Sequence, residues 1–197
     1  MRAAVALVAE RGTTAVSISD IAEGADVSRQ LVYLQFGDRD ALLMEAALDL
    51  ASRELLPRLR DAPEDSTGRS RAVATARHFA DHRSFYRAML TGSCGFALNR
   101  ALDDLFMLLN RRLAEQLLDD SPEPGAADDL ARYLTGGAAA VFNTWVIDGD
   151  DPLDPELFAD RLLRMLAVLT GAARRGGASA DQTLFPGGEH PPPPHHQ

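Results

Sequence analysis

The sequence contains no lysine, and all twenty of its basic residues are arginine. It contains a single cysteine, Cys94, so no disulfide bond can form within the chain and no zinc site can be built from several thiolates. Its apolar stretches fall short of the roughly 20 residues that a helix needs to span a bilayer, and no signal peptide is visible at its start. These absences favour a cytoplasmic protein without a membrane anchor.

The charge balance is acidic, because 29 Asp and Glu residues face 20 arginines and leave a net charge of −9. A protein of this charge is not expected to bind nucleic acid indiscriminately, since its overall field repels phosphate. With 197 residues, 46% of them hydrophobic, the chain is long and apolar enough for one or two small domains with a core.

One stretch, residues 12–43, has the pattern of two short helices followed by a longer one. Ser17 precedes an apolar-periodic run and Asp20 follows three residues later, which is the spacing of a capping box. Asp26 stands where the chain must turn, and an aspartate adopts a left-handed backbone at modest cost. Ser28 can then cap the second helix. The stretch therefore predicts a helix-turn-helix.

The second helix of this motif has one apolar face. Val32 and Phe36 are four residues apart, so both can turn inward. The other side chains are predicted to point outward: Arg29, Gln30, Leu31, Tyr33 and Gln35. A helix this short is not stable by itself, so the rest of the chain must hold it in place.

The motif resembles the DNA-binding domain of the tetracycline-repressor (TetR) family. The resemblance is carried by Gly12, Ser17-Ile18, Asp20-Ile21-Ala22, Ala25, Val27-Ser28, Tyr33, Phe36, Asp38-Arg39 and Leu42. It implies an all-α fold of about nine helices, with an amino-terminal three-helix helix-turn-helix domain and a carboxy-terminal helical bundle. It also implies a homodimeric, ligand-responsive repressor that binds a palindromic double-stranded DNA operator.

The resemblance implies DNA-binding roles for seven side chains: Ser17, Ser28, Arg29, Gln30, Leu31, Tyr33 and Arg39. Arg29 matches guanine and Gln30 matches adenine in the major groove, whereas the Tyr33 hydroxyl and Arg39 are expected on phosphates. The alternative is that Arg29 and Gln30 are solvated and that Tyr33 props the helix. Residues 1–45 hold four arginines and seven acids, about −3 in net charge, so affinity must come from a few placed donors.

The rest of the chain is also predicted to be helical. We expect a helix from Asp38 to about Leu55 that ends at Pro57, and a polar link over residues 57–67. Further helices are expected at residues 68–82, 84–91, 96–119, 127–147 and 155–173. The predicted domains are 1–45 for DNA binding, 46–174 for ligand binding and dimerisation, and 175–197 as a disordered tail.

Two further sites are predicted in the second domain. Aromatic and neighbouring side chains could line a pocket for a small hydrophobic or aromatic ligand: Phe79, Tyr86, Met89, Phe96, Phe106, Phe142, Asn143 and Trp145. An ordinary packed core is the alternative. Small and apolar side chains on the last two helices are predicted to form the dimer interface: Leu134, Ala138, Val141, Leu162, Met165 and Leu169. The alternative is that both helices simply belong to the core of one subunit.

Other chemistries find little support. His78 and His82 have metal-ligand spacing, but no third ligand is apparent nearby, so we expect a pair on the helix surface and no metal or cofactor. Cys94 is expected to be an inert small residue rather than a redox sensor. No nucleophile elbow, phosphate loop or carboxylate pair appears, so we expect no enzyme. The main alternative to the repressor is a helical ligand-binding or interaction protein whose DNA binding has decayed.

Overall fold

The computed structural model describes residues 1–63, 68–118 and 123–180, with side chains described as far as Val168. Cα packing divides the chain into two units, Met1–Leu163 and Arg164–Gln197. The described residues form helices α1 to α10 and one π-helical segment, η1, and include no strand. Because α4, η1 and α5 follow one another without a break, ten α-helices make nine separate rods. The prediction of an all-α fold of about nine helices is confirmed.

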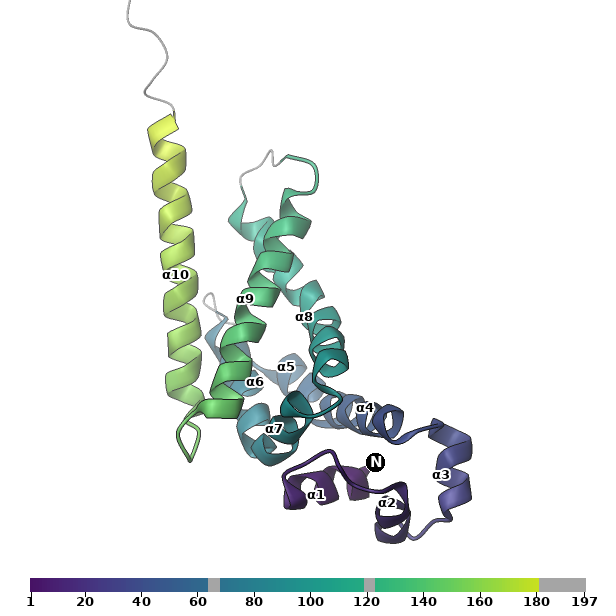
Figure 1. Ribbon diagram of the computed structural model, residues 1–197. Coiled ribbons are helices and arrows are strands. Elements are labelled where there is room, and N and C mark those ends of the chain that lie inside the picture. Colours follow the sequence, from purple (N-terminus) through teal and green to yellow (C-terminus); the bar gives the residue numbers. More distant parts are fainter. Residues whose placement is uncertain (64–67, 119–122, 181–197) are drawn as a thin grey trace, which may run out of the picture. The chain divides into compact units, whose positions relative to one another are not determined.

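The first three helices lie together at the amino-terminal end of the first unit (Figure 1). They are α1 (Arg2–Arg11), α2 (Ile18–Gly24) and α3 (Arg29–Phe36). Gly12 ends α1: its φ of 63° is left-handed, and its N–H donates to the Val8 carbonyl. A glycine adopts this conformation without the steric cost that a Cβ would add. The chain can therefore leave α1 sharply and begin the helix-turn-helix.

The next rod is longer than predicted. It consists of α4 (Arg39–Leu50), η1 (Ala51–Leu55) and α5 (Leu56–Asp61). The prediction that Pro57 ends the helix and opens a polar link is wrong, because Pro57 lies in the first turn of α5, where its missing N–H is not needed. The π-helical segment just before it resets the hydrogen-bond register. As a result Leu59 continues the core-facing side of the rod.

The remaining helices follow the predicted pattern closely. They are α6 (Arg69–Asp81), α7 (Arg83–Thr91), α8 (Gly95–Leu117), α9 (Ala126–Asp148) and α10 (Pro155–Ala180). Among them α8 and α9 pack side by side (Figure 1). The predicted end of the last helix at residue 173 is wrong, since α10 continues to Ala180. The glycines near its end lower helix propensity by only about 1 kcal/mol each, which is not enough to stop a helix.

The core of the first unit runs without interruption from α1 to α9. Its largest fully buried side chains include Leu43, Leu55, Phe85, Tyr86 and Met89. The helices of the DNA-binding motif are thus packed on the same core as α7 and α8. The boundary proposed between residues 45 and 46 falls inside α4, which serves both parts of the unit.

The second unit, from Arg164 onward, includes the carboxy-terminal part of α10. The remainder of the predicted tail, residues 181–197, lies outside the described residues. In the described part of the chain, every helix is too short or too polar to cross a membrane.

Candidate nucleic-acid interface

Side-chain caps hold the helices of the motif in place. The Ser17 hydroxyl accepts the Asp20 N–H at 3.0 Å, and the Ser28 hydroxyl accepts the Leu31 N–H at 3.2 Å. Each bond satisfies a backbone donor that the first turn of a helix leaves without an intrahelical partner. The capping roles predicted for Ser17 and Ser28 are confirmed. Both serines are also exposed, so their hydroxyls stand at the surface near the starts of α2 and α3.

The turn between α2 and α3 is strained at one residue. Asp26 has a φ of 53°, the left-handed conformation predicted for it. Before it, the Ala25 N–H donates to the Ile21 carbonyl, and after it the Val27 N–H donates to the Ala22 carbonyl at 3.0 Å. These bonds close the turn on both sides of Asp26 and fix the angle at which α3 leaves α2.

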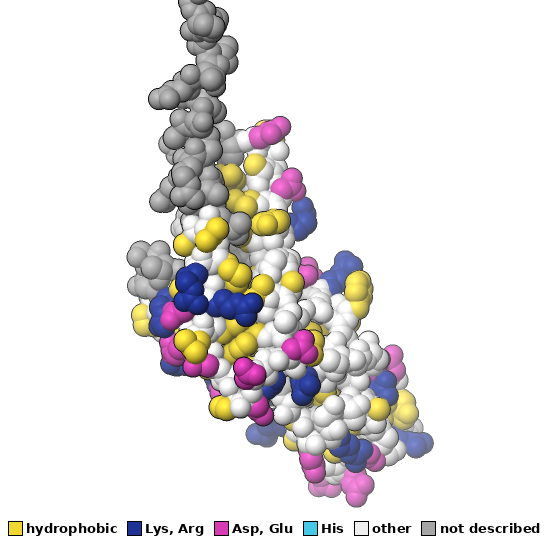
Figure 2. Space-filling model, turned by 60° about the vertical axis from the view of Figure 1, so that its left-hand side comes forward, with side chains coloured by type: hydrophobic (Ala, Val, Ile, Leu, Met, Phe, Trp, Pro, Cys, Tyr) yellow, Lys and Arg dark blue, Asp and Glu magenta, His cyan; other side chains and the backbone are white. Residues whose placement is uncertain are grey.

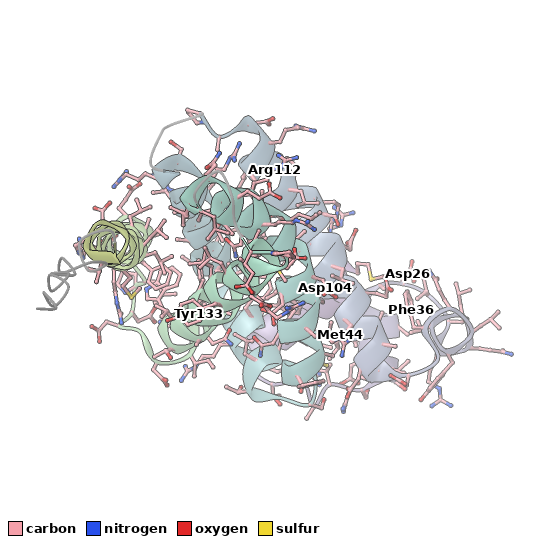
Figure 3. The ribbon with its side chains drawn as sticks, turned by 90° about the horizontal axis from the view of Figure 1, so that it is seen from above. Asp26, Phe36, Met44, Asp104, Arg112 and Tyr133 are labelled. Atoms are coloured by element: carbon pink, nitrogen blue, oxygen red, sulfur yellow. The ribbon has the colours of Figure 1, made fainter. Side chains whose placement is uncertain are left out.

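The orientation of α3 agrees with the predicted pattern. Val32 is 5% exposed and Phe36 is half-buried against the core, whereas the five side chains predicted to point outward are all exposed. Figure 3 shows Phe36 at the outer edge of the first unit, where the side chains of α3 fan out into solvent. The Arg29 guanidinium lies 5.8 Å from the centre of the Tyr33 ring. Arg29 and Tyr33 therefore share one exposed face, and the attraction between cation and ring restrains both.

One exposed side chain of α3 was missed by sequence reasoning. Leu34 is 84% exposed, more than Leu31 or Tyr33. It lies four residues after Gln30, so it shares the face predicted to meet the bases. That spacing is the signal that could have identified it. An apolar side chain of this kind suits contact with a thymine methyl group.

Arg39 is engaged within the protein. Its Nε donates to Asp40 Oδ1 at 2.9 Å, and its Nη2 donates to the Ser93 hydroxyl at 3.4 Å. Ser93 belongs to the turn between α7 and α8, so Arg39 connects the start of α4 to that turn. A phosphate at Arg39 would have to share the guanidinium with Asp40 or displace it.

Acidic residues near the motif are partly compensated. Arg11 on α1 and Asp20 on α2 form an ion pair at 2.6 Å, and the hydrogen bond from Arg11, followed by that from Ser17, lowers the pKa of the Asp20 carboxyl. Figure 2 shows basic and acidic side chains mixed over the end of the unit where α1 to α3 lie. This surface therefore carries interspersed positive and negative charges, and its binding to an anion such as a DNA phosphate depends on individual hydrogen-bond donors.

The predicted ligand-pocket residues are mostly brought together. The centroid of the Phe79 ring lies 4.5 Å from that of Tyr86 and 5.4 Å from that of Phe142, and the centroids of Phe142 and Trp145 are 6.0 Å apart. Phe158 on α10, which was not predicted, extends this group by stacking on Trp145 at 4.1 Å. These five rings link α6, α7, α9 and the start of α10, and we name them the aromatic cluster.

The other predicted pocket residues lie in different environments. Met89 is fully buried and Phe106 is half-buried against the core, but Phe96 is 81% exposed at the start of α8 and stands apart from the cluster. Asn143 donates to the Asn99 side-chain carbonyl at 2.7 Å, across α8 and α9. This amide pair places polar groups within an otherwise apolar helix interface.

The predicted dimer residues belong to both units. Leu134, Ala138, Val141 and Leu162 in the first unit, and Met165 in the second, are each half-buried, and the side chain of Leu169 lies outside the described residues. Apolar side chains that are more exposed occur on the same helices: Tyr133 at 64%, Leu157 at 66% and Val168 at 68%. Gly136 and Gly137 are exposed, and a Cβ built on either meets no described atom within 4 Å. Helix α9 therefore has an open, small-residue surface.

The expectation of a surface histidine pair is wrong. His78 is fully buried, its Nε2 lies 2.8 Å from the Tyr86 hydroxyl, and burial lowers its pKa to about 4. His82 is partly buried, and its Nε2 lies 2.7 Å from a carboxylate oxygen of Glu54 on η1. The sequence could not reveal Glu54 as a neighbour, because it is contributed by a different rod.

Cys94 is buried at the break between α7 and α8. Burial, followed by the charge of Asp40, raises the pKa of its thiol, which disfavours the reactive thiolate.

Comparisons with known proteins agree with this geometry. Residues 1–46 match the family described as bacterial regulatory proteins, tetR family. The chain is 28% identical over 159 residues to the HTH-type transcriptional regulator AlkX of Mycobacterium tuberculosis, covering 81% of this chain and 67% of that protein. It is 29% identical over 156 residues to the HTH-type transcriptional regulator BetI of Rhizobium meliloti, covering 73% of each.

A solved structure shares the fold. It is that of the dihydroxyacetone kinase operon activator DhaS, with a TM-score of 0.55 over 87% of this chain and 93% of that one, at 18% identity. This likeness concerns the fold alone. Taken with the capped helix-turn-helix and the outward face of α3, the matches identify residues 1–46 as a helix-turn-helix domain of the tetR family, in a chain that is similar to HTH-type transcriptional regulators.

Proposed function

We propose that the protein is a ligand-responsive repressor that binds its operator as a homodimer. The observation that carries this proposal is the exposed face of α3, which displays Arg29, Gln30 and Tyr33 while Val32 anchors the helix. In the proposal, residues 1–45 read DNA and residues 46–174 bind the ligand and the second subunit. We propose no enzymatic activity.

The proposed DNA contacts divide into two kinds. Arg29 and Gln30, in the first turn of α3, read base edges, and Leu31 contacts a thymine methyl group. The hydroxyls of Ser17, Ser28 and Tyr33, together with the Arg39 guanidinium, bind phosphates. Two copies of α3 would enter successive major grooves about 34–36 Å apart, which requires a two-fold dimer and a palindromic operator.

Selection of bound sequences from a random DNA pool, followed by fluorescence anisotropy at several salt concentrations, tests the DNA-binding part. Replacing Arg39 by Ala should weaken binding to all sequences and lower the salt slope by about 0.9 for each lost phosphate contact. Replacing Arg29 or Gln30 by Ala should relax specificity at one position and cost about 1–3 kcal/mol there. Arg132→Ala, an exposed arginine on α9, serves as the control. Selection that enriches no common site would contradict the proposal.

The homodimer is supported by the open surface of α9. A side chain at Gly137 would meet no described atom of its own subunit, and Arg favours a helix over Gly by roughly 0.8 kcal/mol. Gly137→Arg should therefore leave the fold of the subunit intact and break only a contact with a second subunit. Analytical ultracentrifugation should detect a dimer for the parent protein and a monomer for this variant. Ser52→Arg, on the exposed side of η1, should remain dimeric.

Ligand control is supported by the aromatic cluster and by the neighbouring Asn99–Asn143 pair, which suit a hydrophobic or aromatic molecule with one polar group. The ligand would act by favouring a dimer whose two α3 helices no longer match the half-site spacing. Trp145 is the only tryptophan, so its fluorescence reports on this cluster directly. A ligand that releases DNA should also change Trp145 emission, and release without such a change would place the ligand elsewhere.

The second candidate function is a helical ligand-binding protein with decayed DNA binding. The acidic charge of residues 1–45 and the engagement of Arg39 by Asp40 favour it. This candidate predicts ligand binding by Trp145 fluorescence with no DNA sequence enriched at low salt. The repressor predicts both activities, so the two measurements together decide between them.

A further inference from the structure

Three side chains from two rods lie close together in the first unit. Glu54 comes from η1, and His78 and His82 come from α6 and its carboxy-terminal cap. One potential ligand atom from each residue lies within 4.8 Å of the other two. His78 is fully buried, whereas the side chains of His82 and Glu54 are 23% and 36% exposed. We name these three residues the Glu-His-His cluster.

The hydrogen bonds of the cluster leave one buried nitrogen unsatisfied. His78 Nε2 shares a hydrogen bond with the Tyr86 hydroxyl at 2.8 Å, but His78 Nδ1 has no hydrogen-bond partner among the described residues. A buried polar atom without a partner costs free energy, and such atoms are rare in folded proteins. Because Nε2 is already engaged, Nδ1 is the nitrogen that remains for a ligand.

A metal ion would supply the missing partner. Histidines that bind metals through one ring nitrogen almost always engage the other in a hydrogen bond, as His78 does with Tyr86. Two imidazoles and one carboxylate form a ligand set used by zinc, with a fourth position left for water. The i, i+4 spacing of His78 and His82 places both on one face of α6.

The distances are close to those that an ion requires. Ligands about 2.0–2.2 Å from a tetrahedral Zn²⁺ lie roughly 3.3–3.6 Å from one another. Glu54 and His82, now 2.7 Å apart, would have to separate, and the widest spacing in the cluster, at most 4.8 Å, would have to shrink by roughly 1 Å. Both adjustments are available to Glu54 and His82, because these two side chains reach the surface.

The surroundings also allow an ion to enter. His82 and Asp81 line an open cleft of about 610 Å³, so solvent reaches the edge of the cluster. Arg58 lies close to the cluster, with its guanidinium 3.8 Å from the Glu54 carboxylate and 2.8 Å from that of Asp81. When Glu54 binds an ion, Arg58 can keep its closer partner Asp81.

We propose that Glu54, His78 and His82 bind one divalent transition-metal ion of the zinc type, with His78 coordinating through Nδ1. The ion would link η1 to α6 and would so stabilise the packing of the rod formed by α4, η1 and α5 against α6. This inference goes beyond the proposed regulator, and it stands whether or not the protein binds an operator.

The test uses the full-length chain with three tail histidines replaced, His190→Asn, His195→Asn and His196→Asn, because these could bind metal adventitiously. Titration calorimetry with ZnCl₂ should give one site per chain, and Co²⁺ should produce the visible absorption of a tetrahedral site. Glu54→Gln and His82→Asn should each weaken binding by roughly 100-fold, since loss of a direct ligand costs at least as much as loss of its hydrogen-bond partner. Asp61→Asn, which removes an exposed acid of the same rod that pairs with Arg60 and lies outside the cluster, should bind as the parent does.

Three results would overturn the proposal. They are the absence of a one-to-one site in the parent, unchanged affinity in both Glu54→Gln and His82→Asn, and an equal loss of affinity in Asp61→Asn. Thermal unfolding provides a second readout that does not depend on heat of binding. Zinc should raise the unfolding temperatures of the parent and of Asp61→Asn by much more than those of Glu54→Gln and His82→Asn.

Discussion

The buried imidazole of His78 makes the stability of the metal-free protein depend on pH. Its ordinary pKa is 6.5, and desolvation, followed by the charge of His82, lowers the pKa to about 4 in the folded chain. Above about pH 6.5 the ring is neutral in both the folded and the unfolded chain, so it adds no pH dependence. Between about pH 6.5 and 4 only the unfolded chain binds the proton, and stability must fall as the pH falls.

The magnitude follows from the difference between the two pKa values. A shift of 6.5 − 4, about 2.5 units, at 1.36 kcal/mol per unit corresponds to about 3 kcal/mol in the free energy of unfolding. This loss is spread over the window with a slope approaching 1.4 kcal/mol per pH unit. Glu54 affects stability at lower pH. The hydrogen bond from His82 depresses the pKa of the Glu54 carboxyl below 4.5, so the contribution of this carboxylate to folding stability is lost only as the pH falls further.

Urea unfolding followed by Trp145 fluorescence, in the presence of a chelator, measures this slope. His78→Gln should lose most of this slope, whereas His190→Gln, a control that removes a histidine far along the sequence, should keep it. If His78→Gln does not fold, the ring resonances of His78 in the parent should remain those of a neutral imidazole down to about pH 5. A stability that is flat between about pH 6.5 and 4.5 would refute the reasoning, because it would mean that the folded chain protonates this ring as easily as the unfolded chain does.

Three further predictions concern other parts of the first unit. Asp26→Gly should raise the free energy of unfolding by up to about 1 kcal/mol, since glycine removes the cost of the left-handed turn; Asp26→Asn, which removes only the charge, should gain less by the same urea titration. Arg83→Lys should lower the free energy of unfolding by about 2 kcal/mol. The largely buried Arg83 guanidinium donates to the carbonyls of Val146 and Gly149 at the end of α9, and a single ammonium group cannot make both bonds in the same geometry. An equal loss in the exposed control Arg132→Lys would contradict this. Cys94 should react with a thiol-specific chromogenic disulfide only after unfolding, since burial raises the pKa of its thiol, and rapid reaction of the native protein would show that this thiol is accessible.

The parts of the molecule that depend on short spacings were predictable. The caps at Ser17 and Ser28, the stop at Gly12 and the left-handed Asp26 each involve a side chain and a backbone group a few residues apart. The inward direction of Val32 follows from the helical period alone. The functional assignment of the exposed residues of α3 rests on resemblance and remains a prediction.

Other features could not be inferred from the sequence, because they depend on the backbone geometry of a whole rod or on contacts between residues far apart in the chain. Pro57 was expected to end a helix, but the π-helical segment before it allows the rod to continue. Phe96 was grouped with the pocket aromatics by residue type, although it faces solvent at the start of α8. Arg39 was expected to be available to a phosphate, yet Asp40 and the distant Ser93 engage it.

By itself the sequence determined the helical content, the helix-turn-helix and the outward face of α3, because periodicity, capping and turn preference act over one or two turns of chain. Only the tertiary structure decided that Glu54 joins His78 and His82, that Tyr86 engages one nitrogen of His78 while no described residue pairs with the other, and that Phe158 completes the aromatic cluster. These neighbours come from different rods, and the packing that brings rods together depends on the shape of the whole core rather than on any local spacing.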